Sequence, residues 1–181
     1  RKIERVVVLG ANGTMGIGSA ALFTTAVPHV TFLARTREKA EEGLAAAIKQ
    51  VRSPTVASRS AVGDYDNDLD AAVEKADLIF ETLTEDFAIK KDMFDRIEKA
   101  RREDSIVATV TSGLSINQLC EGRSDSFRKN FMGLHFFNPP NVIVGTELIA
   151  GKDTDPELVD FIDAFSTIRL GRDMIRTHDT P

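Results

Sequence analysis

The chain has 181 residues, of which 42% are hydrophobic and 28% charged, a size and composition typical of one ordinary globular domain rather than a disordered or fibrous segment. Its net charge of −5 offers no general attraction to nucleic acid or to an anionic membrane, so neither is expected as a partner. One cysteine cannot form an internal disulfide, and the three histidines show no metal-ligand spacing, so no metal and a reducing, cytoplasmic setting are expected. No apolar run approaches the roughly 18 residues of a membrane span.

The first part of the chain alternates between strand-like and helix-like segments. Residues 3–9 are largely β-branched and predict a strand, and residues 15–25 predict a helix that opens at a cluster of glycines. The apolar run at 30–34 predicts a second strand, and residues 37–51 predict a helix with alanine and leucine on one side. Because proline lacks an N–H donor and restricts the residue before it, residues 53–55 are expected to form a loop.

The middle of the chain continues this alternation. A third strand is expected over residues 57–62, a short helix over 69–75 and a fourth strand over 77–82. Residues 86–102 place apolar side chains at helical spacing with the charges opposite, which predicts a long amphipathic helix. A fifth strand is expected over residues 105–110.

The last third of the chain predicts a short helix at 116–120 and a strand at 131–137 that prolines terminate. An extended segment is expected at 147–150, a helix at 156–168 and a final strand at 173–177. Strands that alternate with helices predict an α/β fold of the Rossmann type, a doubly wound and mostly parallel sheet with helices on both faces.

Three glycines separate the first strand from the first helix, in the stretch GANGTMG. Gly10, Gly13 and Gly16 have the spacing G-x-x-G-x-x-G, one residue longer than the common dinucleotide fingerprint G-x-G-x-x-G. Such a turn lets a pyrophosphate approach the backbone closely, and the helix start supplies unpaired N–H groups with a favourable dipole. The context therefore predicts nucleotide binding by these glycines with Thr14 and Met15, although a tight turn without a ligand has the same pattern.

The second strand ends at Arg35, followed by Thr36 and Arg37. A carboxylate at this place would accept a hydrogen bond from the ribose diol of NAD, whereas a guanidinium pairs well with the 2′-phosphate of NADP. Arg35 therefore has two open interpretations, an NADP-binding residue or a solvated charge beside an NAD site. The same glycine spacing is also found at the start of the short-chain dehydrogenases. These need Tyr and Lys four residues apart, and the one tyrosine, Tyr65, has Leu69 at that distance, so the catalytic pair is absent.

The second half of the chain carries a more specific pattern. The stretch GLHFFNP at 133–139, together with residues 76–85 and Thr111-Ser112, closely resembles the amino-terminal domain of L-3-hydroxyacyl-CoA dehydrogenases. The resemblance implies a cofactor-binding domain, here over residues 1–181, and hydride transfer between nicotinamide and a 3-hydroxyacyl-CoA or 3-ketoacyl-CoA in fatty-acid β-oxidation. The final Asp-Thr-Pro resembles the start of that family's D-T-P-G-F stretch, so a helical carboxyl-terminal substrate and dimerisation domain is expected to follow in a longer parent.

The resemblance also implies roles for particular residues. His135 would take the hydroxyl proton, and Glu147, which follows at 147 − 135 = 12 residues, would fix the histidine tautomer. Ser112 and Asn138 would bind the substrate oxygen or its neighbours, although Ser112 could equally cap a helix. The cofactor contacts implied by the turn and by the family are Gly10, Gly13, Thr14, Met15, Gly16, Arg35, Glu85 and Lys90.

Three features depart from the family pattern: Arg35 stands in place of the usual acid, the glycine turn is longer, and Val110 replaces an asparagine. The first two leave NAD against NADP open. The expected partners are an acyl-CoA substrate and a homodimeric parent, which could be fused to an enoyl-CoA hydratase. Two other functions stay open, a dinucleotide-binding module without catalysis and a hydroxyacid dehydrogenase that does not use CoA thioesters.

Overall fold

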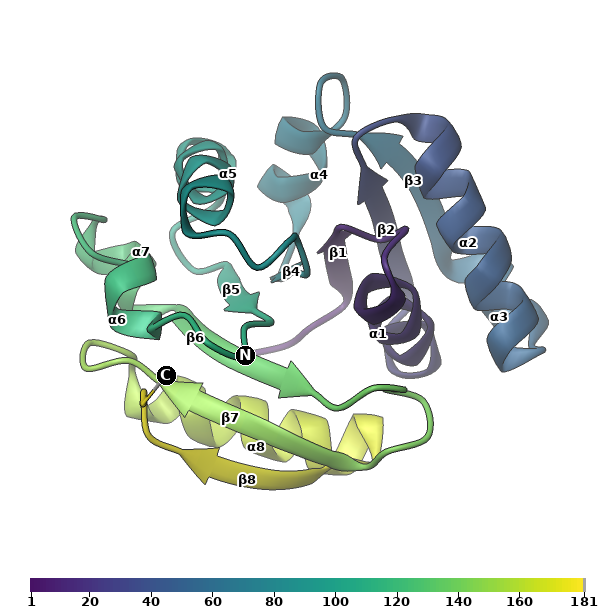
Figure 1. Cartoon of the computed structure of the whole chain (residues 1–181). Helices are drawn as coiled ribbons and strands as arrows, with labels where there is room; N and C mark the ends of the chain where they lie inside the picture. Colours follow the sequence, from purple (N-terminus) through teal and green to yellow (C-terminus); the bar gives the residue numbers. More distant parts are fainter. Residues whose placement is uncertain (181) are drawn as a thin grey trace.

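The computed structural model describes residues 1–180, and its framework is an eight-stranded sheet with helices on both faces (Figure 1). The strands are β1 (Arg5–Leu9), β2 (His29–Ala34), β3 (Ser60–Asp64), β4 (Leu78–Glu81), β5 (Ile106–Thr109), β6 (Phe131–Phe136), β7 (Gly145–Ala150) and β8 (Asp173–Thr177). The helices are α1 (Thr14–Ala26), α2 (Arg37–Val51), α3 (Pro54–Arg59), α4 (Leu69–Lys75), α5 (Phe87–Ala100), α6 (Ile116–Leu119), α7 (Asp125–Lys129) and α8 (Pro156–Leu170).

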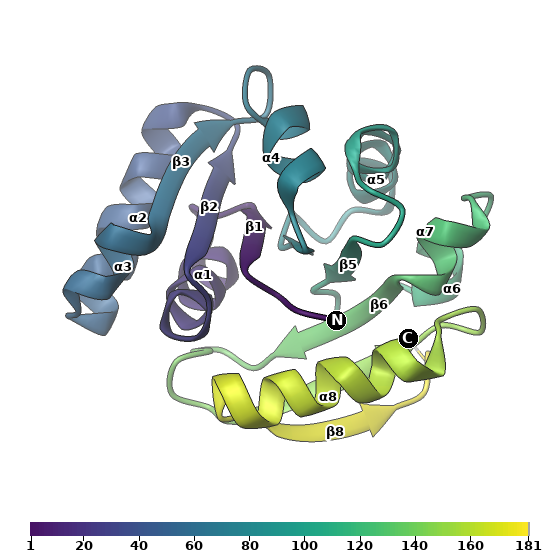
Figure 2. The ribbon, with the colours of Figure 1, turned by 180° about the vertical axis from the view of Figure 1, so that it is seen from behind.

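The strand order across the sheet is β3-β2-β1-β4-β5-β6-β7-β8, with β3 and β8 at the two edges (Figure 2). The first six strands run parallel, β7 is antiparallel to β6, and β8 is parallel to β7. Parallel neighbours need crossover connections, and the helices between them supply these. The arrangement confirms the doubly wound, mostly parallel Rossmann-type fold that the alternating pattern predicts.

Both faces of the sheet are buried, which explains the unbroken apolar run of the first strand. Val6 and Val8 of β1 belong to a core shared with α1, α2, α3 and α8. Val7 and Leu9 point the other way, into a second core shared with α4, α5, α6 and α7. Because side chains alternate between the faces of a strand, a strand covered on both faces needs an apolar residue at every position.

The segment after α2 differs from the prediction. Pro54 begins helix α3 instead of a loop, and the expected strand over 57–62 was wrong in its first half because β3 starts only at Ser60. Proline is well placed in a first helical turn, where its missing N–H would have no partner, and Ser53 caps the helix by accepting from the Thr55 N–H at 3.3 Å. The helix buries Val56 against the α1 side of the sheet.

Helix α7 also lies outside the expected elements. Ser124 caps it by accepting from the Phe127 N–H at 3.2 Å, and Phe127 packs against both Phe94 of α5 and Phe131 of β6, which also contact each other. The segment is too short to show helical periodicity, and the packing of this one aromatic ring stabilises it.

The other expected elements are present, with ends that differ by a few residues.

The hairpin between β6 and β7 positions the candidate site. The antiparallel register places His135 directly opposite Glu147. The connecting loop packs on α1, since a Cβ added to Gly18 would lie 2.8 Å from the Pro140 ring. The loop that follows the GLHFFNP stretch is therefore seated against the helix that opens at the glycine turn.

Candidate active site and nucleotide cleft

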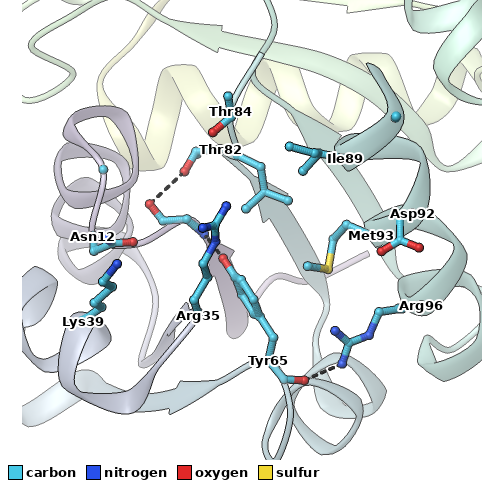
Figure 3. A pocket seen from close by; sticks show the side chains of 14 residues that line it. Asn12, Arg35, Lys39, Tyr65, Thr82, Thr84, Ile89, Asp92, Met93 and Arg96 are labelled. Carbon is cyan, nitrogen blue, oxygen red and sulfur yellow. Dashed lines mark hydrogen bonds between the residues drawn. The ribbon is translucent and has the colours of Figure 1, made fainter. Parts of the chain in front are cut away.

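A cleft of about 680 Å³ opens where the strand order reverses between β1 and β4. The chain leaves β1 towards β2 and leaves β4 towards β5, so the connections diverge and leave a crevice at the carboxyl ends of the strands. The cleft walls come from the glycine turn, the end of β2, the loops after β3 and β4, and helix α5 (Figure 3). Its size suits a small ligand or part of a nucleotide.

The long glycine turn is built as a tight turn of four residues, closed by a hydrogen bond from the Gly13 N–H to the Gly10 carbonyl at 2.9 Å. Gly10 has φ of 76°, and a Cβ there would lie 2.7 Å from the Thr82 carbonyl oxygen. A Cβ on Gly16 would lie 2.1 Å from the Gly10 carbonyl oxygen. The extra residue leaves Asn12 exposed on the cleft wall, so the turn tolerates it without losing its two close backbone approaches.

The end of this turn fits a dinucleotide phosphate. Gly13 is the N-cap of α1, it makes no side-chain capping bond, and the first turn holds no acidic residue. Gly13 is exposed, and a Cβ added there would have only the Gly10 carbonyl oxygen within 4 Å, at 3.4 Å. The first N–H groups of a helix, here those around Thr14 and Met15, have no intrahelical partner and favour an anion.

Gly16→Ala and Gly13→Val should separate the structural from the ligand-binding role of these glycines. Gly16→Ala is expected to destabilise the fold by about 3 kcal/mol or more, because the backbone carbonyl it meets cannot move aside. Gly13→Val should change stability by about 1 kcal/mol, as a weaker N-cap, yet lower dinucleotide affinity at least about tenfold. Urea denaturation and fluorescence titration with NADH and NADPH measure the two effects. Normal binding by Gly13→Val would contradict a phosphate site at this turn.

Tyr65 supports the turn from the loop after β3. Its hydroxyl accepts a hydrogen bond from the Gly10 N–H at 2.8 Å, and burial raises the pKa of Tyr65 to about 12. Arg96 of α5 in turn donates to the Tyr65 carbonyl, which ties that loop to the helix (Figure 3). The sequence offers no local signal for these contacts, because Gly10 and Tyr65 are 55 positions apart.

The two arginines after β2 have different environments. Arg35 lines the cleft, and so does Lys39 of α2, for which the sequence predicted no role. Arg37 instead donates to the Asp68 carboxylate at 3.0 Å and to the Val62 carbonyl at 3.1 Å. Of the two, therefore, Arg35 is the residue that faces the cleft.

The second group of interest joins β5, β6 and β7. His135 Nδ1 lies 2.9 Å from Glu147 Oε2, and His135 Nε2 lies 3.3 Å from Ser112 Oγ. A carboxylate accepts from Nδ1–H, which leaves Nε2 as the basic nitrogen facing the serine. Ser112 is not a helix cap, because Ser115 caps α6 by accepting from the Gln118 N–H. The predicted residues Ser112, His135 and Glu147 thus form one hydrogen-bonded chain.

Ser112, His135 and Glu147 line a cavity of about 260 Å³, and the last described residues, 177–180, line another part of it. Asp179 caps α6 by accepting from the Ile116 and Asn117 N–H groups at 2.8 and 2.9 Å. Although burial raises the pKa of Asp179, these bonds lower it below the usual range. Asn138 is exposed just beyond β6, and in residues 1–180 it makes no side-chain hydrogen bond to this group, so its role stays a prediction.

Glu85 follows the β4 loop residues that line the nucleotide cleft, lines neither that cleft nor the smaller cavity, and bonds the loop that carries Ser112. It accepts from the Ser112 and Gly113 N–H groups at 2.8 and 3.0 Å and from the Thr111 hydroxyl. Burial raises the pKa of Glu85, but these donors outweigh it and hold the pKa below its usual value. Glu85 is therefore an ionised residue that holds the loop carrying Ser112 next to the loop that follows β4.

Lys90 lies behind Glu85 and is completely buried. Its ammonium donates to both carboxylate oxygens of Glu81, at 2.8 and 3.0 Å, and to the Val110 carbonyl at 3.0 Å. Burial raises the pKa of Glu81, and Lys90 opposes that shift. Lys90 lines neither cleft, so it supports the site from inside the protein, and its direct contact with a cofactor stays a prediction.

Other reactive features lie apart from these sites. Cys120 is a buried free thiol whose pKa burial raises. Within residues 1–180, no group of three or more His, Cys, Asp or Glu side chains is arranged to hold a metal ion. None of the helices in this range is both long and apolar enough to cross a bilayer.

Three features define a Rossmann-type dinucleotide-binding domain of the dehydrogenase class. They are the cleft where the strand order reverses, the start of α1 without a side-chain cap, and the pair of His135 and Glu147. Residues 5–180 match the family model described as 3-hydroxyacyl-CoA dehydrogenase, NAD binding domain. The chain belongs to this family, as the GLHFFNP stretch predicted.

Relatives support the assignment. The chain is 32% identical to a probable 3-hydroxyacyl-CoA dehydrogenase of Bacillus subtilis over 210 residues, which covers 100% of this chain and 26% of that protein. It is 33% identical to 5-formyl-3-hydroxy-2-methylpyridine 4-carboxylate 5-dehydrogenase of Mesorhizobium japonicum, covering 97% of this chain and 55% of that protein. The crystal structure of (S)-3-hydroxybutyryl-CoA dehydrogenase from Ralstonia eutropha superposes with a TM-score of 0.86 at 28% identity, covering 99% of this chain and 65% of that one. The chain thus spans only part of each relative.

Proposed function

We propose that this chain is the cofactor-binding part of a dehydrogenase that interconverts 3-hydroxyacyl-CoA and 3-ketoacyl-CoA in fatty-acid β-oxidation. The observation that carries the proposal is the hydrogen-bonded chain Ser112, His135 and Glu147, next to a dinucleotide cleft in a member of this family. A nicotinamide bound in the cleft would accept the hydride that leaves the substrate carbon.

Residues of this protein transfer the proton. His135 Nε2 takes the proton of the 3-hydroxyl as the carbon–oxygen double bond forms, and returns it when the reaction runs backwards. Glu147 on the opposite ring nitrogen holds the tautomer and stabilises the imidazolium that results. Ser112 lies within reach of the same ring nitrogen and can orient the substrate oxygen, with Asn138 proposed as a second contact.

The direct experiment follows oxidation of NADH or NADPH by acetoacetyl-CoA with the full-length protein that contains this chain. Turnover is expected from the full-length protein. The isolated chain should show little, because it spans only part of each relative and the proposed substrate domain of the parent would close over the acyl-CoA. Dinucleotide binding by both proteins without turnover by either would favour the alternative, a binding module without catalysis.

A substrate without CoA is the second candidate, and the similarity to the Mesorhizobium japonicum pyridine-carboxylate dehydrogenase favours testing it. Proton transfer by His135 acts on the hydroxyl group alone and needs no CoA thioester, so the same chemistry serves both substrate classes. A panel of 3-ketoacyl-CoA thioesters of different chain length and free hydroxyacids, assayed on the full-length protein, separates them. Preference for a free acid would overturn the CoA assignment and leave the dehydrogenase assignment intact.

For the parent we propose a homodimer that acts in the cytoplasm, where the free thiol of Cys120 would stay reduced. Since the chain spans 26% of its Bacillus subtilis relative, a longer parent has room for a fused enoyl-CoA hydratase. Mass measurement of the purified parent tests the homodimer, a crotonyl-CoA hydration assay tests the fused hydratase, and cell fractionation tests the location.

A further inference from the structure

The cleft is basic, although the chain as a whole is acidic. Three cationic side chains line it, from Arg35, Lys39 and Arg96, against one carboxylate, from Asp92, which gives 3 − 1 = +2. The chain carries a net charge of −5. A local excess of positive charge in an acidic protein marks the place where an anionic ligand group is favoured.

Two of these cations gather at the end of β2. Arg35 is the first residue after the strand, Lys39 lies in the first turn of α2, and Figure 3 shows the two on the same side of the cleft as Asn12. Both are exposed, and within residues 1–180 neither has an ion-pair partner within 4.0 Å. The amino end of α2 adds its partial positive charge to the same place.

Carboxylates that could serve a ribose diol are engaged elsewhere. Asp64, at the end of β3, is the register partner of Ala34 and thus the acid on the neighbouring strand. It accepts from the N–H groups of Asp66 and Asn67 at 3.0 and 2.8 Å, inside its own loop. Asp68 in the same loop pairs with Arg37. At the carboxyl ends of β2 and β3, the described cleft wall therefore offers a guanidinium and an ammonium, but no carboxylate.

We propose that the cleft selects the 2′-phosphorylated cofactor, NADP, with Arg35 bonding the 2′-phosphate through its planar fork and Lys39 adding a second positive charge. This inference rests on the proposed function, since it concerns the cofactor of the same dehydrogenase. A ribose 2′-substituent lies at the end of the second strand in this fold, where Arg35 stands. A bidentate guanidinium–phosphate contact recognises a phosphate far better than a hydroxyl.

The test is fluorescence titration with NADPH and NADH, carried out on the 181-residue chain and on the full-length protein. NADPH should bind about ten- to a hundredfold more tightly at low salt, and the advantage should shrink as salt is added. Competition with 2′,5′-ADP against 5′-AMP should show the same preference, which locates it on the 2′-phosphate.

Variants locate the preference on one residue. Arg35→Leu should bring the two affinities close together, and Arg35→Asp should favour NADH. Lys39→Leu should reduce the preference by a smaller factor. Arg37→Leu is the matched control, since Arg37 pairs with Asp68 outside the cleft, and it should leave the preference unchanged. Thermal unfolding checks that each variant is folded.

The outcomes separate the two proposals. Tighter NADH binding, or a preference that Arg35→Leu does not alter, overturns the NADP inference and leaves the proposed dehydrogenase standing. Failure of both proteins to bind either dinucleotide overturns the proposed function and the inference with it. Tighter NADPH binding that depends on Arg35 supports both.

Discussion

His135→Gln is expected to lower kcat of the full-length protein by about 10²- to 10⁴-fold, the usual contribution of a positioned general base. Glutamine keeps a hydrogen-bonding side chain opposite Glu147 but cannot accept a proton at neutral pH. Binding of NADH and NADPH should stay within about twofold, because His135 lines the smaller cavity rather than the nucleotide cleft. Steady-state turnover of acetoacetyl-CoA and fluorescence titration measure the two quantities.

The control for this substitution is His29→Gln. His29 is exposed at the amino end of β2, whereas the cleft lies at the carboxyl ends of the strands, so turnover should not change. Equal turnover by His135→Gln and His29→Gln would rule out His135 as the base. A loss of dinucleotide binding by His135→Gln would instead show that the substitution disturbs the fold of the cleft.

Lys90→Met is expected to lower the free energy of unfolding by about 3–5 kcal/mol. The substitution keeps an apolar stem of similar length but leaves the buried Glu81 carboxylate without its cation. Changing both residues, as Glu81→Gln with Lys90→Met, should recover much of this loss, because no buried charge then lacks a partner. Urea denaturation of the chain measures both variants and a control, Lys91→Met, since the Lys91 ammonium bonds the Glu121 carbonyl and lies over the Phe87 ring without a buried carboxylate partner in residues 1–180.

The loss in Lys90→Met should depend on pH. Burial raises the pKa of Glu81, and without Lys90 nothing of comparable strength opposes this. A group whose pKa is raised in the folded state stabilises the fold at low pH and loses that contribution as the pH rises through the folded pKa. The variant should therefore approach the unsubstituted chain in its free energy of unfolding below about pH 5, and be less stable than that chain at neutral pH. A loss no larger than that of Lys91→Met at neutral pH would contradict the buried ion pair.

Local patterns predicted most of the elements, because each strand and helix carries its own periodicity. They were wrong over residues 57–59, which belong to α3, and α7 lay outside the prediction. Both helices are short, and each depends on one buried side chain, Val56 or Phe127. Which of two weak conformations a short segment adopts is decided by the core it meets, and periodicity does not record that core.

The site shows the same division. The family resemblance linked His135 to Glu147, and the antiparallel register of β6 and β7 then places them face to face. Tyr65 instead entered only as evidence against a short-chain dehydrogenase, yet it bonds the Gly10 N–H. Contacts of that kind join residues far apart in the chain, so no spacing pattern in the sequence predicts them.

By itself, the sequence determined the alternating fold, the glycine turn, the family and the pair of residues proposed for proton transfer, because each depends on short-range pattern or on a specific motif. Only the tertiary structure decided that Arg35 faces the cleft while Arg37 pairs with Asp68, and that Lys90 is buried behind Glu85. The physical reason is that the direction and partners of a charged side chain depend on neighbours from other strands and helices, and these meet only when the chain has folded.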